Sequence, residues 1–167
     1  MSQEIINRVA KSKLKTIDLD FFCPKTERIS FDIKPWLKDE LFLLEKDFRK
    51  KVENFGWQNF NNKAVFIICS NDAIIPDWAF ILVSSQLNNQ GITNVIGSKE
   101  VLDIKLITDS INTFDFSIYK DKPVIIKGCS DQKIPLSAYS VLLEKLQHHA
   151  KSIMFGEACS SVPIYKS

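Results

Sequence analysis

Four cysteines are the residues of this sequence best suited to chemistry. Three of them, Cys69, Cys129 and Cys159, begin the same short phrase, in which a serine follows directly and a proline comes a few residues later. Thiolates bind soft metals such as zinc and iron, and they hold iron–sulfur clusters. We therefore expect these three thiols to form a site for zinc, iron or an iron–sulfur cluster, with Glu157, Asp72, Asp131 or a water in the fourth position. Cys23 lies outside the phrase and is left out of the site.

The cysteines allow two other interpretations. A thiol enzyme would use Cys129 or Cys159 as its nucleophile and Glu157 or Asp131 as its base. A non-catalytic interaction module would use the cysteines only for packing, because a free cysteine also behaves as a small apolar side chain. The spacing of the cysteines matches no standard metal-binding motif, because no C-x-x-C pair is present. It therefore does not decide between these interpretations. Residues 148–149, the only two histidines, fall at the far end of an expected helix, which argues against a Cys-His pair.

Composition excludes several classes of protein. With 45% hydrophobic and 25% charged residues the chain has a globular composition. It has only five glycines, and it contains neither a phosphate-binding glycine loop nor a G-x-S-x-G nucleophile elbow. A net charge of +2 indicates no nucleic-acid partner. No apolar run approaches the roughly 18 residues of a membrane helix, and no secretory signal is evident, so we expect a cytoplasmic protein with reduced thiols.

An internal repeat organises the second part of the chain, over residues 57–98 and 116–157. Residues of the same type recur at a constant separation, as in Pro76 and Pro135, Ala79 and Ala138, Leu87 and Leu146, and Gly97 and Gly156. Each copy reads as a buried strand, a Cys-Ser turn, a helix with the proline of Ile-Pro at its first position (76–88 and 135–148), and a closing strand. A further helix is expected over residues 99–113.

The alternation of strands and helices predicts an α/β fold with a mostly parallel sheet and helices on both faces. We expect the two strands that lead the repeats, 64–68 and 123–126, to lie side by side at the centre of this sheet. Neighbouring parallel strands are about 4.8 Å apart. That arrangement would bring Cys69 and Cys129 to one edge, with Cys159 one strand further along.

The first 55 residues have a different pattern. Apolar and polar residues alternate before and after the turn-forming segment 23–26, with Ile17, Leu19 and Phe21 on one side and Ile29, Phe31 and Ile33 on the other. Period-two alternation around a turn predicts an antiparallel hairpin. Apolar residues at helical spacing then predict a helix over 44–55. We expect the hairpin, the helix and the two repeats to form a single domain over 1–167.

Three phrases carry a resemblance to a known family. They are Asp-Ala-Ile-Ile-Pro-Asp-Trp-Ala at 72–79, Lys-Pro-Val-Ile-Ile-Lys-Gly-Cys-Ser at 122–130, and Ser-Ile-Met-Phe-Gly-Glu-Ala-Cys-Ser-Ser-Val-Pro at 152–163. With these phrases the chain resembles an uncharacterised bacterial family, domain of unknown function 2480, over nearly its whole length. The resemblance supplies no activity and no catalytic residues. It implies an accessory role beside sulfur-mobilising iron–sulfur assembly proteins, which are the expected partners together with a second copy of the chain.

Overall fold

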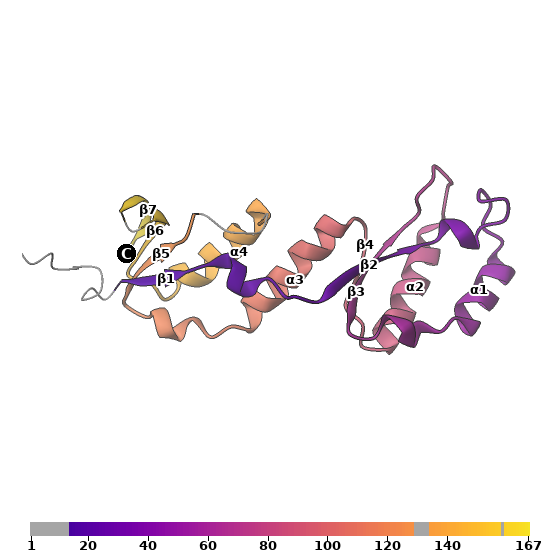
Figure 1. The fold of residues 1–167 in the computed structure, drawn as a ribbon, viewed down its shortest axis with the longest axis horizontal. Coiled ribbons are helices and arrows are strands. Elements are labelled where there is room, and N and C mark those ends of the chain that lie inside the picture. The colour runs from indigo at the N-terminus through magenta and orange to yellow at the C-terminus, as the bar shows by residue number, and fades with distance from the viewer. Residues whose placement is uncertain (1–13, 129–133, 158) are drawn as a thin grey trace, which may run out of the picture. The chain divides into compact units, whose positions relative to one another are not determined.

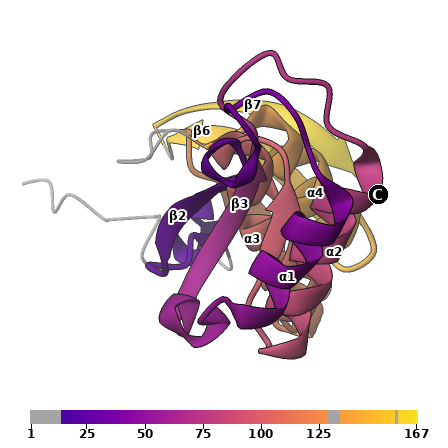
Figure 2. The same cartoon turned by 90° about the vertical axis from the view of Figure 1, so that its right-hand side faces the viewer.

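The chain forms two compact units, which Figures 1 and 2 show in two views. The structure is a computed structural model that describes residues 14–128, 134–157 and 159–167. Unit 1 combines the segment that ends at Pro24 with Leu106–Ser167, and unit 2 is Lys25–Lys105. The boundary at Pro24 divides the expected N-terminal segment 1–55 between the units. The single domain expected over 1–167 stays a prediction.

Unit 2 is built on a three-stranded parallel sheet in the order β2-β3-β4. Its strands and helices are β2 (Glu27–Asp32), α1 (Glu45–Asn54), β3 (Lys63–Ile68), α2 (Asp77–Asn89) and β4 (Asn94–Ile96). Helices α1 and α2 pack against each other and share one apolar core with β2 and β3 (Figure 2). Arg28, on the other face of β2, is paired with Asp103 of α3 (Lys99–Thr113) at 2.8 Å.

Unit 1 is built on a four-stranded sheet in the order β1-β5-β6-β7. Its elements are β1 (Lys15–Ile17), β5 (Pro123–Ile126), α4 (Leu136–Gln147), β6 (Ser152–Glu157) and β7 (Ser160–Lys166), with the second half of α3. The first three strands in this order are parallel, and β7 is antiparallel to β6. Ile107 and Ile111 of α3 lie in the same apolar core as α4.

The structure confirms the α/β fold class and the two strand-helix-strand repeats. Helices α2 and α4 each follow a proline in extended conformation, Pro76 and Pro135. The fully buried residues of the two helices have matching positions: Ala79, Val83 and Leu87 in α2, and Ala138, Leu142 and Leu146 in α4. Burying one leucine or valine side chain contributes roughly 1.5–3 kcal/mol. The repeated apolar stripe therefore fixes each helix on its own sheet.

The prediction that both repeats share one sheet is wrong. Strand β3 has β2 and β4 as its neighbours, and β5 has β1 and β6. Both sides of each leading strand are thus already occupied, so β3 and β5 cannot pair with each other. Each repeat completes its own sheet with a strand from the N-terminal segment.

The predicted N-terminal antiparallel hairpin is also wrong, because β1 and β2 belong to different sheets. Ile17 is opposite Ile126 of β5, and Phe31 is opposite Ile67 of β3, both in parallel register. The alternation correctly indicated two half-buried strands but contained no information about their partners. The segment between them begins with a short 3-10 helix, η1 (Leu19–Phe22), in place of a tight turn.

Candidate functional site

An aspartate ends the N-terminal strand of each unit at the carboxyl edge of its sheet. Asp18 follows β1 and Asp32 ends β2. Each carboxylate accepts a hydrogen bond from the backbone N–H two residues later, Asp20 N in one unit and Lys34 N in the other, both at 3.0 Å. Such hydrogen bonds satisfy N–H groups that a short helix leaves unpaired. Asp18 is the N-cap of η1, whereas Asp32 precedes Ile33, the N-cap of a second short 3-10 helix, η2 (Lys34–Trp36). The two units therefore share an aspartate hydrogen bond after the first strand, as well as the strand-helix-strand repeat.

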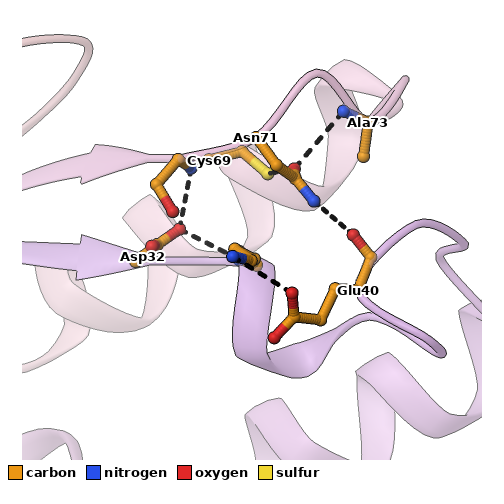
Figure 3. Close-up of polar contacts among 7 residues, drawn as sticks. Asp32, Glu40, Cys69, Asn71 and Ala73 are labelled. Atoms are coloured by element: carbon orange, nitrogen blue, oxygen red, sulfur yellow. Dashed lines mark hydrogen bonds and ion pairs between the residues drawn. The ribbon is translucent and has the colours of Figure 1, made fainter.

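In unit 2, Asp32 also binds the turn that follows β3 (Figure 3). Its Oδ1 accepts a hydrogen bond from Ser70 N at 3.0 Å. Burial raises the pKa of Asp32, but hydrogen bonds from Ser70 and Lys34 and the charge of Lys34 lower it by more, so the pKa lies below its usual 3.8. Asp32 is therefore ionised at neutral pH and holds the ends of β2 and β3 together.

Cys69 takes part in the same turn. Its thiol donates a hydrogen bond to Asn71 Oδ1 at 2.9 Å, and the Ala73 backbone N–H donates to the same oxygen at 3.3 Å. The Asn71 amide donates to the backbone carbonyl of Glu40, whose side chain is paired with Lys34 at 3.0 Å (Figure 3). Cys69 is half-buried and packs against the core of unit 2. These surroundings give Cys69 a structural role that requires no metal.

In unit 1, an ion pair occupies the corresponding edge. Lys127 Nζ lies 3.2 Å from Asp18 Oδ2, and the Lys127 backbone N–H donates to the carbonyl of Ile17 at 2.9 Å. The acidic groups Asp18 and Asp20 are close enough to α4 to act on Tyr139 by their charge. Burial raises the pKa of Tyr139, and the charges of Asp18, Asp20 and Cys23 raise it further.

The carboxyl ends of β5 and β6 touch through two glycines. A Cβ atom built on Gly128 would lie 3.2 Å from Gly156 Cα. Gly156 has a φ of +121°, and a Cβ there would lie 2.6 Å from the Ser160 carbonyl oxygen. Residues without side chains are thus required where the β5 end meets the β6–β7 hairpin.

The predicted metal ligands are divided between the two units. Cys69 belongs to unit 2, whereas Cys159 and Glu157 belong to unit 1. Glu157 ends β6 opposite Ser160, and Cys159 is exposed in the turn between β6 and β7. Cys129 and Asp131 lie outside the described residues. Within the described ranges no three Cys, His, Asp or Glu side chains gather as a metal site. The three-thiol site stays a prediction, without the shared sheet that suggested it.

The position predicted for Cys23, in a hairpin turn away from the parallel sheet, is wrong. Cys23 follows η1, donates to the Leu19 carbonyl at 3.5 Å and packs against the core of unit 1. His148 and His149 come directly after α4, as expected. None of the helices in the described part of the chain is long and apolar enough to cross a membrane.

The sequence contains one further signal, which the hairpin interpretation concealed. Asp18 and Asp32 each stand between two apolar residues, in Ile17-Asp18-Leu19 and Phe31-Asp32-Ile33. The hairpin prediction treats both segments as arms of one hairpin. The repeated phrase instead indicates one strand for each unit, followed by an aspartate that accepts a hydrogen bond from the backbone N–H two residues later.

Comparison with protein families identifies the whole chain with one of them. The family model of DUF2480, described as a protein of unknown function, matches residues 3–167. The chain belongs to this family. Comparison with curated proteins and with solved structures gives no match. Family membership therefore assigns no activity, and a function has to be inferred from the geometry of the carboxyl edges.

Proposed function

We propose that this DUF2480 protein binds a soft metal, zinc, iron or an iron–sulfur cluster, at the carboxyl edge of unit 1. The proposed ligands are Cys129 and Cys159, with Glu157 as the candidate oxygen ligand. The observation that supports this choice is the contact between Gly128 and Gly156. Cys129 is joined to Gly128 by a single peptide bond, and Cys159 follows Gly156 by three residues in the β6–β7 hairpin.

The donor types suit such a metal. Zinc takes thiolate ligands at about 2.3 Å and carboxylate oxygens at about 2.0–2.2 Å. Two thiolates and one carboxylate would leave a coordination position for water or a partner's ligand. The resemblance to the family implies sulfur-mobilising iron–sulfur assembly proteins as partners, and such an open position would let a partner supply a ligand.

Cys69 is not a ligand in this proposal. It belongs to a different sheet from β5 and β6, and its thiol is already a hydrogen-bond donor to Asn71. It begins the same Cys-Ser phrase in the other repeat, so it provides a matched control for the two proposed ligands.

Metal analysis of protein purified without oxygen tests the proposal. If the site is mononuclear, the wild type should contain close to one equivalent of zinc or iron per chain. If it holds a cluster, the wild type should contain close to one iron–sulfur cluster per chain. Cys129→Ser and Cys159→Ser should lose most of this metal, whereas Cys69→Ser should retain it. Metal below a tenth of an equivalent in the wild type, with all thiols freely titratable, would refute metal binding.

A metal-free protein with one rapidly labelled cysteine would instead favour the thiol enzyme. Uniformly slow labelling in a metal-free protein would favour the interaction module.

A further inference from the structure

Unit 1 contains a pocket that no thiol of the described residues lines. It has a volume of about 560 Å³ and lies where the carboxyl ends of β5 and β6 meet the start of α4. The side chains that line it include Ile126, Leu136, Tyr139, Leu143, Phe155 and Ile164. Small-molecule sites have volumes of about 300–1,000 Å³, and in open α/β sheets they lie outside the carboxyl ends of the strands.

Leu136, at the rim of this pocket, has a polar counterpart in the other repeat. Leu136 is the first residue of α4, and the equivalent first residue of α2 is Asp77. An aspartate is stabilising at a helix N-terminus, whereas a leucine that is 84% exposed contributes little to folding. The fold therefore does not require an apolar residue here, and a ligand that covers Leu136 would explain its presence.

Leu143 shows the same difference further along the helix. Its counterpart in α2 is Ser84, whose hydroxyl donates to Asn94 Oδ1 at 2.6 Å. Unit 2 thus tolerates a polar side chain where unit 1 presents an apolar wall. Exposed Ile164 of β7, a strand with no counterpart in unit 2, adds to that wall.

Tyr139 adds a hydroxyl to this apolar lining. Its counterpart in α2 is Phe80, so the ring alone would satisfy the fold. The Tyr139 ring packs edge-on against Phe155 with centroids 5.8 Å apart. A tyrosine hydroxyl is protonated at neutral pH and is able to donate a hydrogen bond, and burial raises the pKa of Tyr139 further.

The charges near Tyr139 restrict what it can bind. Asp18 and Asp20 are the acidic groups whose charge acts on its hydroxyl most strongly, followed by Cys23. Lys127 is paired with Asp18 and offsets that carboxylate in part. A negatively charged ligand group would be repelled by the remaining acidic charge, so the hydroxyl suits an uncharged acceptor such as a ketone or amide oxygen.

We propose that this pocket binds a small uncharged molecule with an apolar body and one carbonyl oxygen, and that Tyr139 donates a hydrogen bond to that oxygen. Leu136 and Leu143 contact the apolar body. Gly128 also lines this pocket, so the pocket lies beside the proposed metal site, but the proposed ligand contacts use no thiol and no metal.

Fluorescence titration of the full chain with prodan, an uncharged naphthalene ketone, tests this binding. Anilinonaphthalene sulfonate, an anion of similar ring size, should bind more weakly than prodan. Leu136→Asp copies the residue of the other repeat and should weaken prodan binding on the order of ten-fold, because it removes an apolar contact worth about 1.4 kcal/mol. Tyr139→Phe should weaken binding several-fold.

The matched control is Ile74→Asp in unit 2, where the isoleucine is 94% exposed and lies outside this pocket. It should bind prodan like the wild type. Circular dichroism should show Leu136→Asp folded, because the side chain it replaces is largely in solvent. Equal prodan binding by Leu136→Asp and wild type, or equal loss in Ile74→Asp, would overturn the proposal. A wild-type dimer that Leu136→Asp converts to monomer would also overturn it, since a second copy would then occupy the pocket.

Discussion

Replacing Asp32 by alanine should destabilise unit 2 by about 2 kcal/mol. The change removes the acceptor of two backbone hydrogen bonds, from Lys34 and Ser70, each 3.0 Å long. A hydrogen bond to a charged group contributes about 1.5–3 kcal/mol. The sum is reduced because the Ser70 contact is exposed to solvent. Asp32→Asn keeps one oxygen acceptor and should lose only about half as much.

The pH dependence of the stability of unit 2 tests the role of Asp32 in a second, independent way. The pKa of Asp32 is lower in the folded protein than its usual 3.8, so the folded state favours the ionised carboxylate. The stability that it provides is therefore fully present above 3.8 and is lost as the pH falls through the lower, folded-state pKa. The difference between wild type and Asp32→Ala should shrink across that acidic window toward the smaller difference expected between Asp32→Asn and Asp32→Ala, because a protonated carboxyl still offers one oxygen acceptor.

Tryptophan fluorescence during urea unfolding is the appropriate assay. The three tryptophans, Trp36, Trp57 and Trp78, all lie in unit 2, so their emission reports that unit alone. Asp72→Ala, in the turn after β3, serves as the control and should change stability by less than about 0.5 kcal/mol. Two results would refute the role of Asp32 in binding the two turns. One is a loss for Asp32→Ala at neutral pH that is no larger than for this control, and the other is a loss that persists unchanged in acid.

Two further predictions concern mainly unit 1. Gly156→Ala should destabilise it by about 2 kcal/mol or more, because the new Cβ would lie 2.6 Å from a carbonyl oxygen in a backbone conformation that L-residues rarely adopt. Gly91→Ala in unit 2, at a φ of +70° with open space around it, should cost only about 1 kcal/mol; thermal melts followed by circular dichroism compare the two, and equal losses would contradict the steric explanation. In an alkaline absorbance titration, Tyr119 and Tyr139 should ionise above the usual 10.0, because burial raises both pKa values. The protein should lose stability above pH 10, where the unfolded tyrosines ionise first; ionisation of all tyrosines at the usual value would show that neither ring is buried.

Local structure was predictable from the sequence because it depends on residues close together in the chain. The prolines before α2 and α4 marked the helix starts, and the stripe from Ala138 to Leu146 marked the buried face of α4. The helix expected over 99–113 has those bounds in the structure. These features follow from helix geometry and capping alone.

Strand pairing was not predictable in the same way. The alternation around Ile17 and Phe31 shows that one face of each strand is buried, but a burial pattern does not distinguish β5 from β3 as a partner. The last strand, β7, was missed because Pro163 interrupts its pattern, and proline is tolerated only at a sheet edge. The pocket was missed because its lining comes from β5, α4, β6 and β7 together.

The candidate site depended on strand pairing and changed with it. Placing β3 and β5 in separate sheets removes the reason to group Cys69 with Cys129 and Cys159. The Gly128–Gly156 contact, which requires the folded hairpin, supplies a different reason to group the last two. A proposed two-thiol site in unit 1 therefore replaces the three-thiol site.

Cobalt titration of the reduced protein tests this central claim most directly, because each thiolate ligand adds to the ligand-to-metal charge-transfer absorption of cobalt. We predict a charge-transfer band that saturates near one cobalt per chain, with an intensity that corresponds to two thiolates. The band should lose at least half of its intensity in Cys159→Ser and remain unchanged in Cys69→Ser. The absence of a band in the wild type, or its equal loss in Cys69→Ser, would contradict a thiolate site in unit 1.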